Sequence, residues 1–154
     1  MKKLIVLITI VIVSIIVIFS LFVILSNNLK NSRQGELVGK MNCDIALDDI
    51  SVELLNDTRG GITGDGVTIY KLSINEGFDI NKLDLSAWMS LPVSEYIVDQ
   101  YMVDAQPEGR IICKLQRGNW KIIGENKEFG MYRNIVLYAY DEEGRCFYIY
   151  KWDS

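Results

Sequence analysis

The loop from Asp57 to Gly66 holds the residues whose types and spacing best suit ligand chemistry. It reads Asp-Thr-Arg-Gly-Gly-Ile-Thr-Gly-Asp-Gly, with four glycines in its last seven residues. Glycine lets the backbone approach a ligand closely, and Asp57, Arg59 and Asp65 supply charged groups. Two interpretations stay open: a ligand or partner contact built on Asp57, Arg59 and Asp65, or a tight hairpin loop whose residues satisfy unusual backbone angles.

The loop does not match the common phosphate or calcium motifs. A phosphate-binding loop continues with Lys and Ser or Thr and opens a helix, whereas a strand pattern begins at Val67 here. A calcium loop needs acidic residues at positions 1, 3 and 5 and a Glu at position 12, and Asp57 and Asp65 alone do not supply them. We therefore expect no metal ion and no cofactor.

The chain contains no histidine, so the commonest general base and metal ligand is absent. Ser-His-Asp and Cys-His nucleophile systems are excluded. The acidic residues could supply the carboxylate pair of a glycosidase, but they show no specific spacing. We expect a protein that is not an enzyme, with a hydrolase using Asp57 and Asp65 as the alternative.

Three cysteines, Cys43, Cys113 and Cys146, lie too far apart in the sequence for the usual zinc site. Cys113 and Cys146 both fall on expected strands and could form a disulfide in an oxidising compartment. Alternatively, Cys113 is a small buried apolar residue that alternates with Ile111 and Leu115.

The loop also carries a resemblance. The run from Asp57 to Gly66, a following strand, Leu91-Pro92 and a Tyr-rich C-terminal hairpin resemble small uncharacterised secreted or membrane-anchored proteins of low-GC Gram-positive bacteria. Those proteins usually carry a form close to Asp-x-His-Gly-Gly-Phe-x-Gly-Asp-Gly, so Arg59 stands where they tend to have His. The resemblance covers residues 50–152 and implies no particular activity.

The N-terminus carries an apolar run from Leu4 to Leu25 without charge, Gly or Pro. As a helix, these 22 residues would extend about 33 Å, enough to cross a lipid bilayer. The run is too long for a typical cleaved signal and ends without a small-residue cleavage site. We expect an uncleaved anchor, with a cleaved signal or a buried helix as alternatives.

The basic pair Lys2 and Lys3 directly precedes the run, which is typical of an anchor whose N-terminus stays in the cytoplasm. Lys30, Arg33 and Lys40 follow the run, so the charge difference is nearly a tie. We expect a cell-membrane protein with its C-terminal domain outside the cytoplasm.

Behind the anchor the pattern predicts an α+β domain: a small antiparallel sheet of about five strands with one short helix packed on it. Two hairpins are expected, one over residues 50–74 and one over residues 134–152. Residues 110–116 and 120–123 are expected strands, and residues 94–102 an expected helix. An aromatic face is expected on the C-terminal hairpin, either as core or as a binding surface, comprising Tyr138, Tyr140, Tyr148, Tyr150 and Trp152.

The expected organisation is therefore an anchor over residues 1–29, a juxtamembrane linker over 30–42 and a domain over 43–154. Without Lys2 and Lys3 the chain has 14 basic and 20 acidic residues, a charge that disfavours nucleic acid. We expect a tethered, non-catalytic domain that contacts the lipid bilayer through its anchor and binds or modulates an envelope protein. Immunity against a toxin or bacteriocin is one form of that function.

Overall fold

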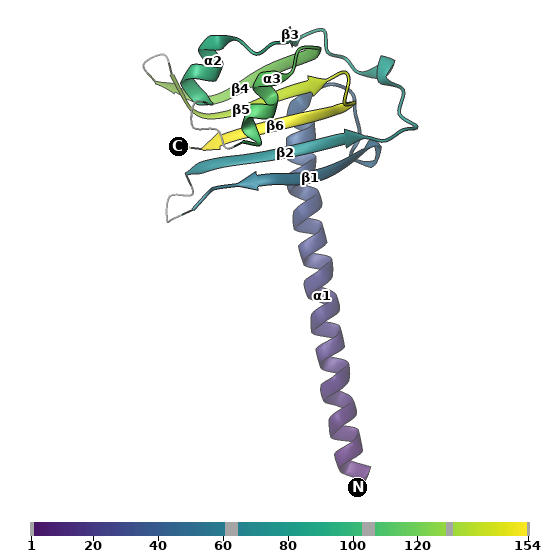
Figure 1. The fold of residues 1–154 in the computed structure, drawn as a ribbon. Helices are drawn as coiled ribbons and strands as arrows, with labels where there is room; N and C mark the ends of the chain where they lie inside the picture. The colour runs from purple at the N-terminus through teal and green to yellow at the C-terminus, as the bar shows by residue number, and fades with distance from the viewer. Residues whose placement is uncertain (1, 61–64, 103–106, 129–130, 154) are drawn as a thin grey trace. The chain divides into compact units, whose positions relative to one another are not determined.

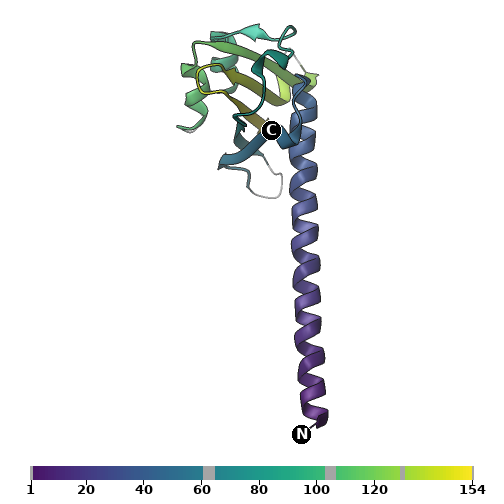
Figure 2. The same cartoon turned by 90° about the vertical axis from the view of Figure 1, so that its right-hand side faces the viewer.

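The computed structural model describes residues 2–60, 65–102, 107–128 and 131–153. The chain divides into two units, residues 1–40 and residues 41–154. Helix α1 spans Lys2–Met41 and is uninterrupted in both views (Figure 1, Figure 2). It makes up the described part of the first unit, and its last residue, Met41, belongs to the second unit. It continues through the stretch expected as a linker and ends where Asn42 adopts a φ of 48°, a conformation common after helix ends.

One segment of α1, Val11–Asn28, is long and apolar enough to cross a membrane, and its side chains are exposed throughout. Exposed large apolar side chains follow one another almost without interruption from Val11 to Leu25. Exposing apolar surface to water costs a free energy of about 25 cal/mol per Å². Such a helix is therefore expected either to lie in a lipid bilayer or to be cleaved from the protein. The exposed apolar helix is consistent with a membrane anchor or a signal sequence.

The second unit is built on a six-stranded antiparallel sheet with the order β1-β2-β6-β5-β4-β3 (Figure 1). The expected α+β class, an apolar N-terminal helix followed by an antiparallel sheet with short helices, is confirmed. The strands are β1 (Ile50–Asp57), β2 (Gly66–Ile74), β3 (Met89–Ser90), β4 (Gly118–Glu128), β5 (Met131–Asp141) and β6 (Cys146–Asp153). The helical segments are α2 (Glu95–Tyr101), α3 (Gly109–Lys114) and the 3₁₀ turns η1 (Leu47–Asp49) and η2 (Ile80–Lys82).

Both expected hairpins form, β1 with β2 and β5 with β6. The expected strand over residues 110–116 was wrong, because this stretch forms α3. Ile112 is buried there and Ile111 is exposed, so the burial does not follow the alternation of Ile111, Cys113 and Leu115. Periodicity alone does not distinguish a strand from a helix in so short an apolar run.

The expected single aromatic face was also wrong. Tyr138 pairs with Ile149 and Tyr140 with Phe147, whereas Tyr148 pairs with Ala139. Directly paired residues of an antiparallel sheet share a face, so Tyr138 and Tyr140 lie on the opposite side of the sheet from Tyr148. Tyr150 and Trp152 share the side of Tyr148, because side chains alternate along a strand.

We call the side with Tyr148 the helix face and the side with Tyr138 the Trp88 face. On the helix face, α2 and α3 pack over the sheet, and the Tyr150 hydroxyl donates a hydrogen bond of 2.7 Å to the Tyr101 carbonyl at the end of α2. On the Trp88 face, the Trp88 ring centroid lies 6.2 Å from that of Tyr138 and 5.9 Å from that of Phe147. Both groups of tyrosines are therefore core residues, as the core interpretation expected.

Candidate functional site

The neck of the loop between β1 and β2 is closed by its own hydrogen bonds. The Thr58 amide donates to the Val67 carbonyl at 2.8 Å, and the Val67 amide donates to the Thr58 hydroxyl at 3.0 Å. Further out, the Gly60 amide donates to the Asp65 carbonyl at 3.4 Å. The tip of the expected motif, residues 61–64, lies outside the described residues.

Gly66 allows the two sides of this neck to approach each other. Its φ is 144°, a conformation that other residues rarely adopt. A Cβ atom at this position would lie 2.8 Å from the Arg59 Cα. Gly66 therefore has a structural role in the hairpin.

Asp57 and Arg59 are joined by a two-pronged ion pair. The Arg59 Nε donates to Asp57 Oδ1 at 2.8 Å and its Nη2 donates to Oδ2 at 2.7 Å. The Arg59 amide and the Thr68 hydroxyl also donate to Oδ1, at 3.2 and 3.4 Å. These hydrogen bonds, with that from the Arg59 side chain contributing most, lower the pKa of Asp57 from 3.8 to about 2.

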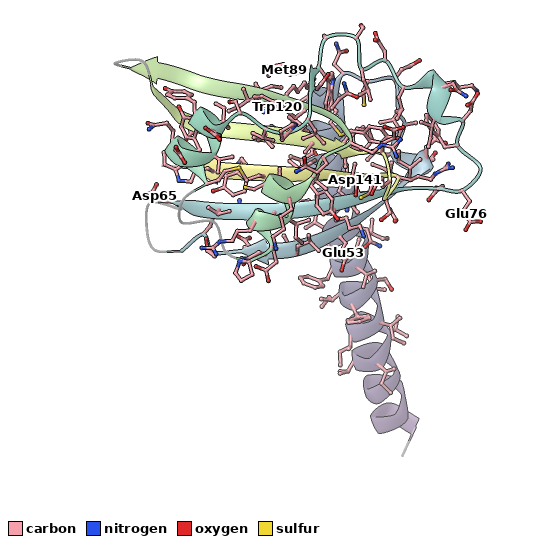
Figure 3. All side chains as sticks on the ribbon, turned by 45° about the horizontal axis from the view of Figure 1, so that its top comes forward. Glu53, Asp65, Glu76, Met89, Trp120 and Asp141 are labelled. Carbon is pink, nitrogen blue, oxygen red and sulfur yellow. The ribbon has the colours of Figure 1, made fainter. Side chains whose placement is uncertain are left out.

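This geometry limits what Asp57 can do chemically. Its carboxylate is ionised at neutral pH, so it cannot donate a proton as a general acid. Both of its oxygens accept hydrogen bonds from Arg59. Asp65 is exposed and lies across from Gly60, whereas Asp57 lies across from Thr68 on the sheet. The structure thus brings Asp57 and Arg59 together and places Asp65 further out along the loop, at the opposite end of β2 from Glu76 (Figure 3).

Two residues of the sheet near this ion pair, Thr68 and Lys151, were missed by the sequence analysis. Thr68 is fully buried and pairs with Lys151 on β6, and Lys151 forms a 3.0 Å ion pair with Asp153. Thr68 and Lys151 are far apart in the sequence, so only the register of β2 with β6 brings them together. Asp57, Thr68 and Lys151 therefore lie in one row across β1, β2 and β6 at this end of the sheet.

A second polar cluster lies on the Trp88 face and had no signal in the sequence. The Lys121 ammonium lies 5.0 Å from the Trp88 ring centroid and 5.6 Å from that of Tyr138. It donates a hydrogen bond to the Met41 carbonyl at the start of the second unit. Burial lowers the pKa of Lys121, and the nearby Cys43 opposes that shift. The cluster attaches the first residues of the unit to the sheet.

The three cysteines are unbridged in the structure. Cys113 lies on α3 and Cys146 is the first residue of β6, so the premise that both belong to strands fails for Cys113, and their disulfide stays a prediction. Burial raises the pKa of all three thiols, to about 11 for Cys43. Each is therefore protonated at neutral pH and is a weak nucleophile or metal ligand.

Within the described part of the chain, no group of three or more Cys, Asp or Glu side chains is placed to hold a metal ion. Comparison with known proteins gives no family model, no curated protein and no solved structure that matches the chain.

Proposed function

We propose that this protein is a single-pass membrane protein whose helix tethers a small, non-catalytic domain outside the cytoplasm, where the domain binds or modulates another envelope component. One observation carries the proposal: an exposed, uncharged helical segment long enough to span a bilayer precedes a unit with its own buried core. A single helix without charged residues in its apolar run is suited to holding a domain at a membrane.

The chemistry of the domain supports binding rather than catalysis. Asp57, the best-placed acid of the loop, is bound by Arg59 and ionised, and the thiols are protonated. Residues 41–154 carry 11 basic and 19 acidic residues, a net charge of −8. Such a surface favours cationic partners and disfavours nucleic acid and anionic lipid headgroups.

Partner binding through the loop can be tested by crosslinking in intact membranes. The full-length protein, an Asp65→Ala variant and a Glu76→Ala variant are each crosslinked and purified under denaturing conditions. Asp65 and Glu76 are both exposed acids, at opposite ends of β2 (Figure 3), so Glu76→Ala controls for loss of charge. We expect a captured protein that Asp65→Ala reduces at least threefold and Glu76→Ala leaves unchanged. Equal capture by the Asp65 variant would contradict the loop as the contact, and no specific capture by any form would contradict the binding function.

The side of the membrane can be tested by thiol labelling of intact cells. Cys43 is a poor target because only 2% of it is exposed. We instead use Glu76→Cys in a Cys113→Ser background, with a membrane-impermeant maleimide. We expect labelling in intact cells equal to that in permeabilised cells. Labelling only after permeabilisation would place the domain in the cytoplasm.

A further inference from the structure

The β4–β5 hairpin extends beyond the rest of the sheet. Both strands have 11 residues, but β6 pairs only with residues 135–141 of β5, and β3 pairs only with residues 119–120 of β4. Among the described residues, 125–128 and 131–134 therefore have only each other as neighbouring strands, and Figure 3 shows this end of the hairpin extending past β6. A ribbon of two strands is marginally stable in water, so this end of the hairpin would be stabilised by a further strand.

Two backbone hydrogen bonds show which residues of β4 face away from β5. The Leu91 amide donates to the Gly118 carbonyl at 3.1 Å, on the β3 side, and the Glu142 amide donates to the Arg117 carbonyl at 3.2 Å, on the β5 side. Backbone groups of consecutive strand residues point to opposite edges. The even-numbered residues of β4 therefore direct their N–H and C=O groups to the outer edge.

The outer edge of β4 is open beyond the short strand β3. The outward N–H and C=O groups of Ile122 and Gly124 have no hydrogen-bond partner among the described residues. β4 keeps one constant register with β5 and contains no proline, so neither a bulge nor a missing N–H blocks the addition of a strand. On the other side of the sheet, the edge of β1 is interrupted by the register shift between Leu54 and Asn56.

We propose that residues 124–128 of β4 pair with the same residues of a second copy of the chain, antiparallel, about a two-fold axis at Asn126. Asn126 then lies opposite Asn126 of the second copy, and Gly124 lies opposite its Glu128. These outward-facing residues form hydrogen-bonded pairs, in which the two residues exchange both backbone bonds. The two-stranded ribbons of the two copies together become a ribbon of four strands.

The charges along β4 favour this register and a second copy as the added strand. Glu125 lies opposite Lys127 of the second copy, and the symmetry repeats this pair, so two pairs of opposite charge form. A two-fold axis at Glu125, Lys127 or Glu128 would instead place like charges directly opposite each other, which is destabilising. An axis at Gly124 would bring residue 128 against Trp120, where β3 is already bound. The proposed axis avoids both conflicts.

Five residues from each copy make a small interface, in the class of weak, transient contacts. The net charge of −8 on each second unit adds a repulsion that salt screens. Crosslinking, which captures transient pairs, is therefore the suitable test. This inference does not depend on which partner the domain binds or on the side of the membrane that it occupies.

Cysteine crosslinking of the full-length protein in membranes tests the register, in a Cys113→Ser background because the other two native cysteines are buried. Asn126→Cys places two thiols on directly opposed residues, whose Cα atoms lie about 5.5 Å apart in such a pair, within disulfide range. Glu128→Cys is the matched control, since two copies of residue 128 lie about 14 Å apart along the strands in this register. The double variant Gly124→Cys/Glu128→Cys restores an opposed pair at a second place.

On mild oxidation we expect a dimer band for Asn126→Cys and for the double variant. We expect at least about tenfold less dimer for Glu128→Cys alone and for the background protein, because their thiols lie outside disulfide range. Comparable crosslinking by Glu128→Cys alone, or no dimer from both Asn126→Cys and the double variant, would overturn the proposal.

Charge exchange in the Asn126→Cys protein tests the opposition of Glu125 and Lys127. Glu125→Lys alone opposes two basic residues and Lys127→Glu alone opposes two acidic residues, so we expect each to reduce the dimer about fivefold. The combined variant Glu125→Lys/Lys127→Glu restores two pairs of opposite charge at an unchanged net charge, and we expect the dimer to return. Equal dimer in all of these forms, or a loss that the combined variant does not reverse, would contradict the proposed register.

Discussion

Asp57 and Arg59 are two residues apart in the sequence, and their ion pair is the best-defined polar feature of the candidate loop. Sequence reasoning found both residues, because aspartate and arginine in a glycine-rich loop are conspicuous. It could not find Thr68 or Lys151, since the register of β2 with β6 brings them to the same place. Two of the three charged residues that made this loop look suited to ligands, Asp57 and Arg59, therefore bind each other.

The Asp57 interaction makes stability depend on pH in a defined direction. Because the folded pKa, about 2, lies below the ordinary 3.8, the stabilisation is complete above pH 4 and is lost as pH falls from 4 to 2. For a partly exposed pair we expect Asp57→Asn to lower the free energy of unfolding by about 0.5 kcal/mol at pH 7. The difference from the unchanged protein should vanish near pH 2.

Urea unfolding followed by tryptophan fluorescence measures this difference, since all three tryptophans belong to the second unit. Asp65→Asn is the control, because Asp65 is exposed on the same loop, and we expect no measurable change. A difference for Asp57→Asn that persists unchanged at pH 2 would show that the ion pair is not its source.

Lys121 gives a second prediction at this scale. Lys121→Met keeps the apolar stem and removes both the donor to the Met41 carbonyl and the charge over the Trp88 ring. We expect a loss of about 1 kcal/mol in the free energy of unfolding. Lys82→Met, at an exposed position, should change stability by less than about 0.5 kcal/mol. Equal changes in the free energy of unfolding for the two variants would show that the contacts of Lys121 do not stabilise the fold.

At the scale of the elements, the β5–β6 hairpin was predictable because alternating β-branched and aromatic residues flank a turn rich in acidic residues and glycine. The register of this hairpin was not predictable, because a shift of one residue moves every side chain of one strand to the opposite face of the sheet. α3 was missed because its six residues are too few to show a helical period, and its position follows from the packing of Ile112 into the core. Local pattern thus predicts which segments pair, and packing determines which side chains meet.

Gly118 tests the close approach of β4 to β5. Its φ is 128°, and a Cβ atom there would clash with the Tyr140 carbonyl. Gly118→Ala should therefore destabilise the fold by at least about 2 kcal/mol. Gly77→Ala is the matched control, because a Cβ at Gly77 would meet nothing within 4 Å, and we expect it to change stability little. The same unfolding experiment compares the two, and a tolerated Gly118→Ala would show that this backbone conformation is not required.

At the scale of the whole molecule, charge and apolar surface are divided between the two units. Residues 1–40 carry five basic residues and one acidic residue, together with the exposed apolar segment of α1, whereas residues 41–154 are acidic and enclose their own core. This division was readable from the sequence, since it depends on composition alone. A binding partner was not readable from the sequence, because recognition of the partner that we propose depends on the geometry of the folded surface.

In the function that we propose, α1 remains attached and holds the domain at the membrane. The most direct measurement is the mass of the protein recovered from cells, after membranes are washed with alkaline carbonate. We expect the N-terminal apolar run to be present and the protein to stay in the washed membranes. Recovery of a soluble form that has lost the residues up to about position 28 would identify the helix as a cleaved signal sequence and contradict the tether.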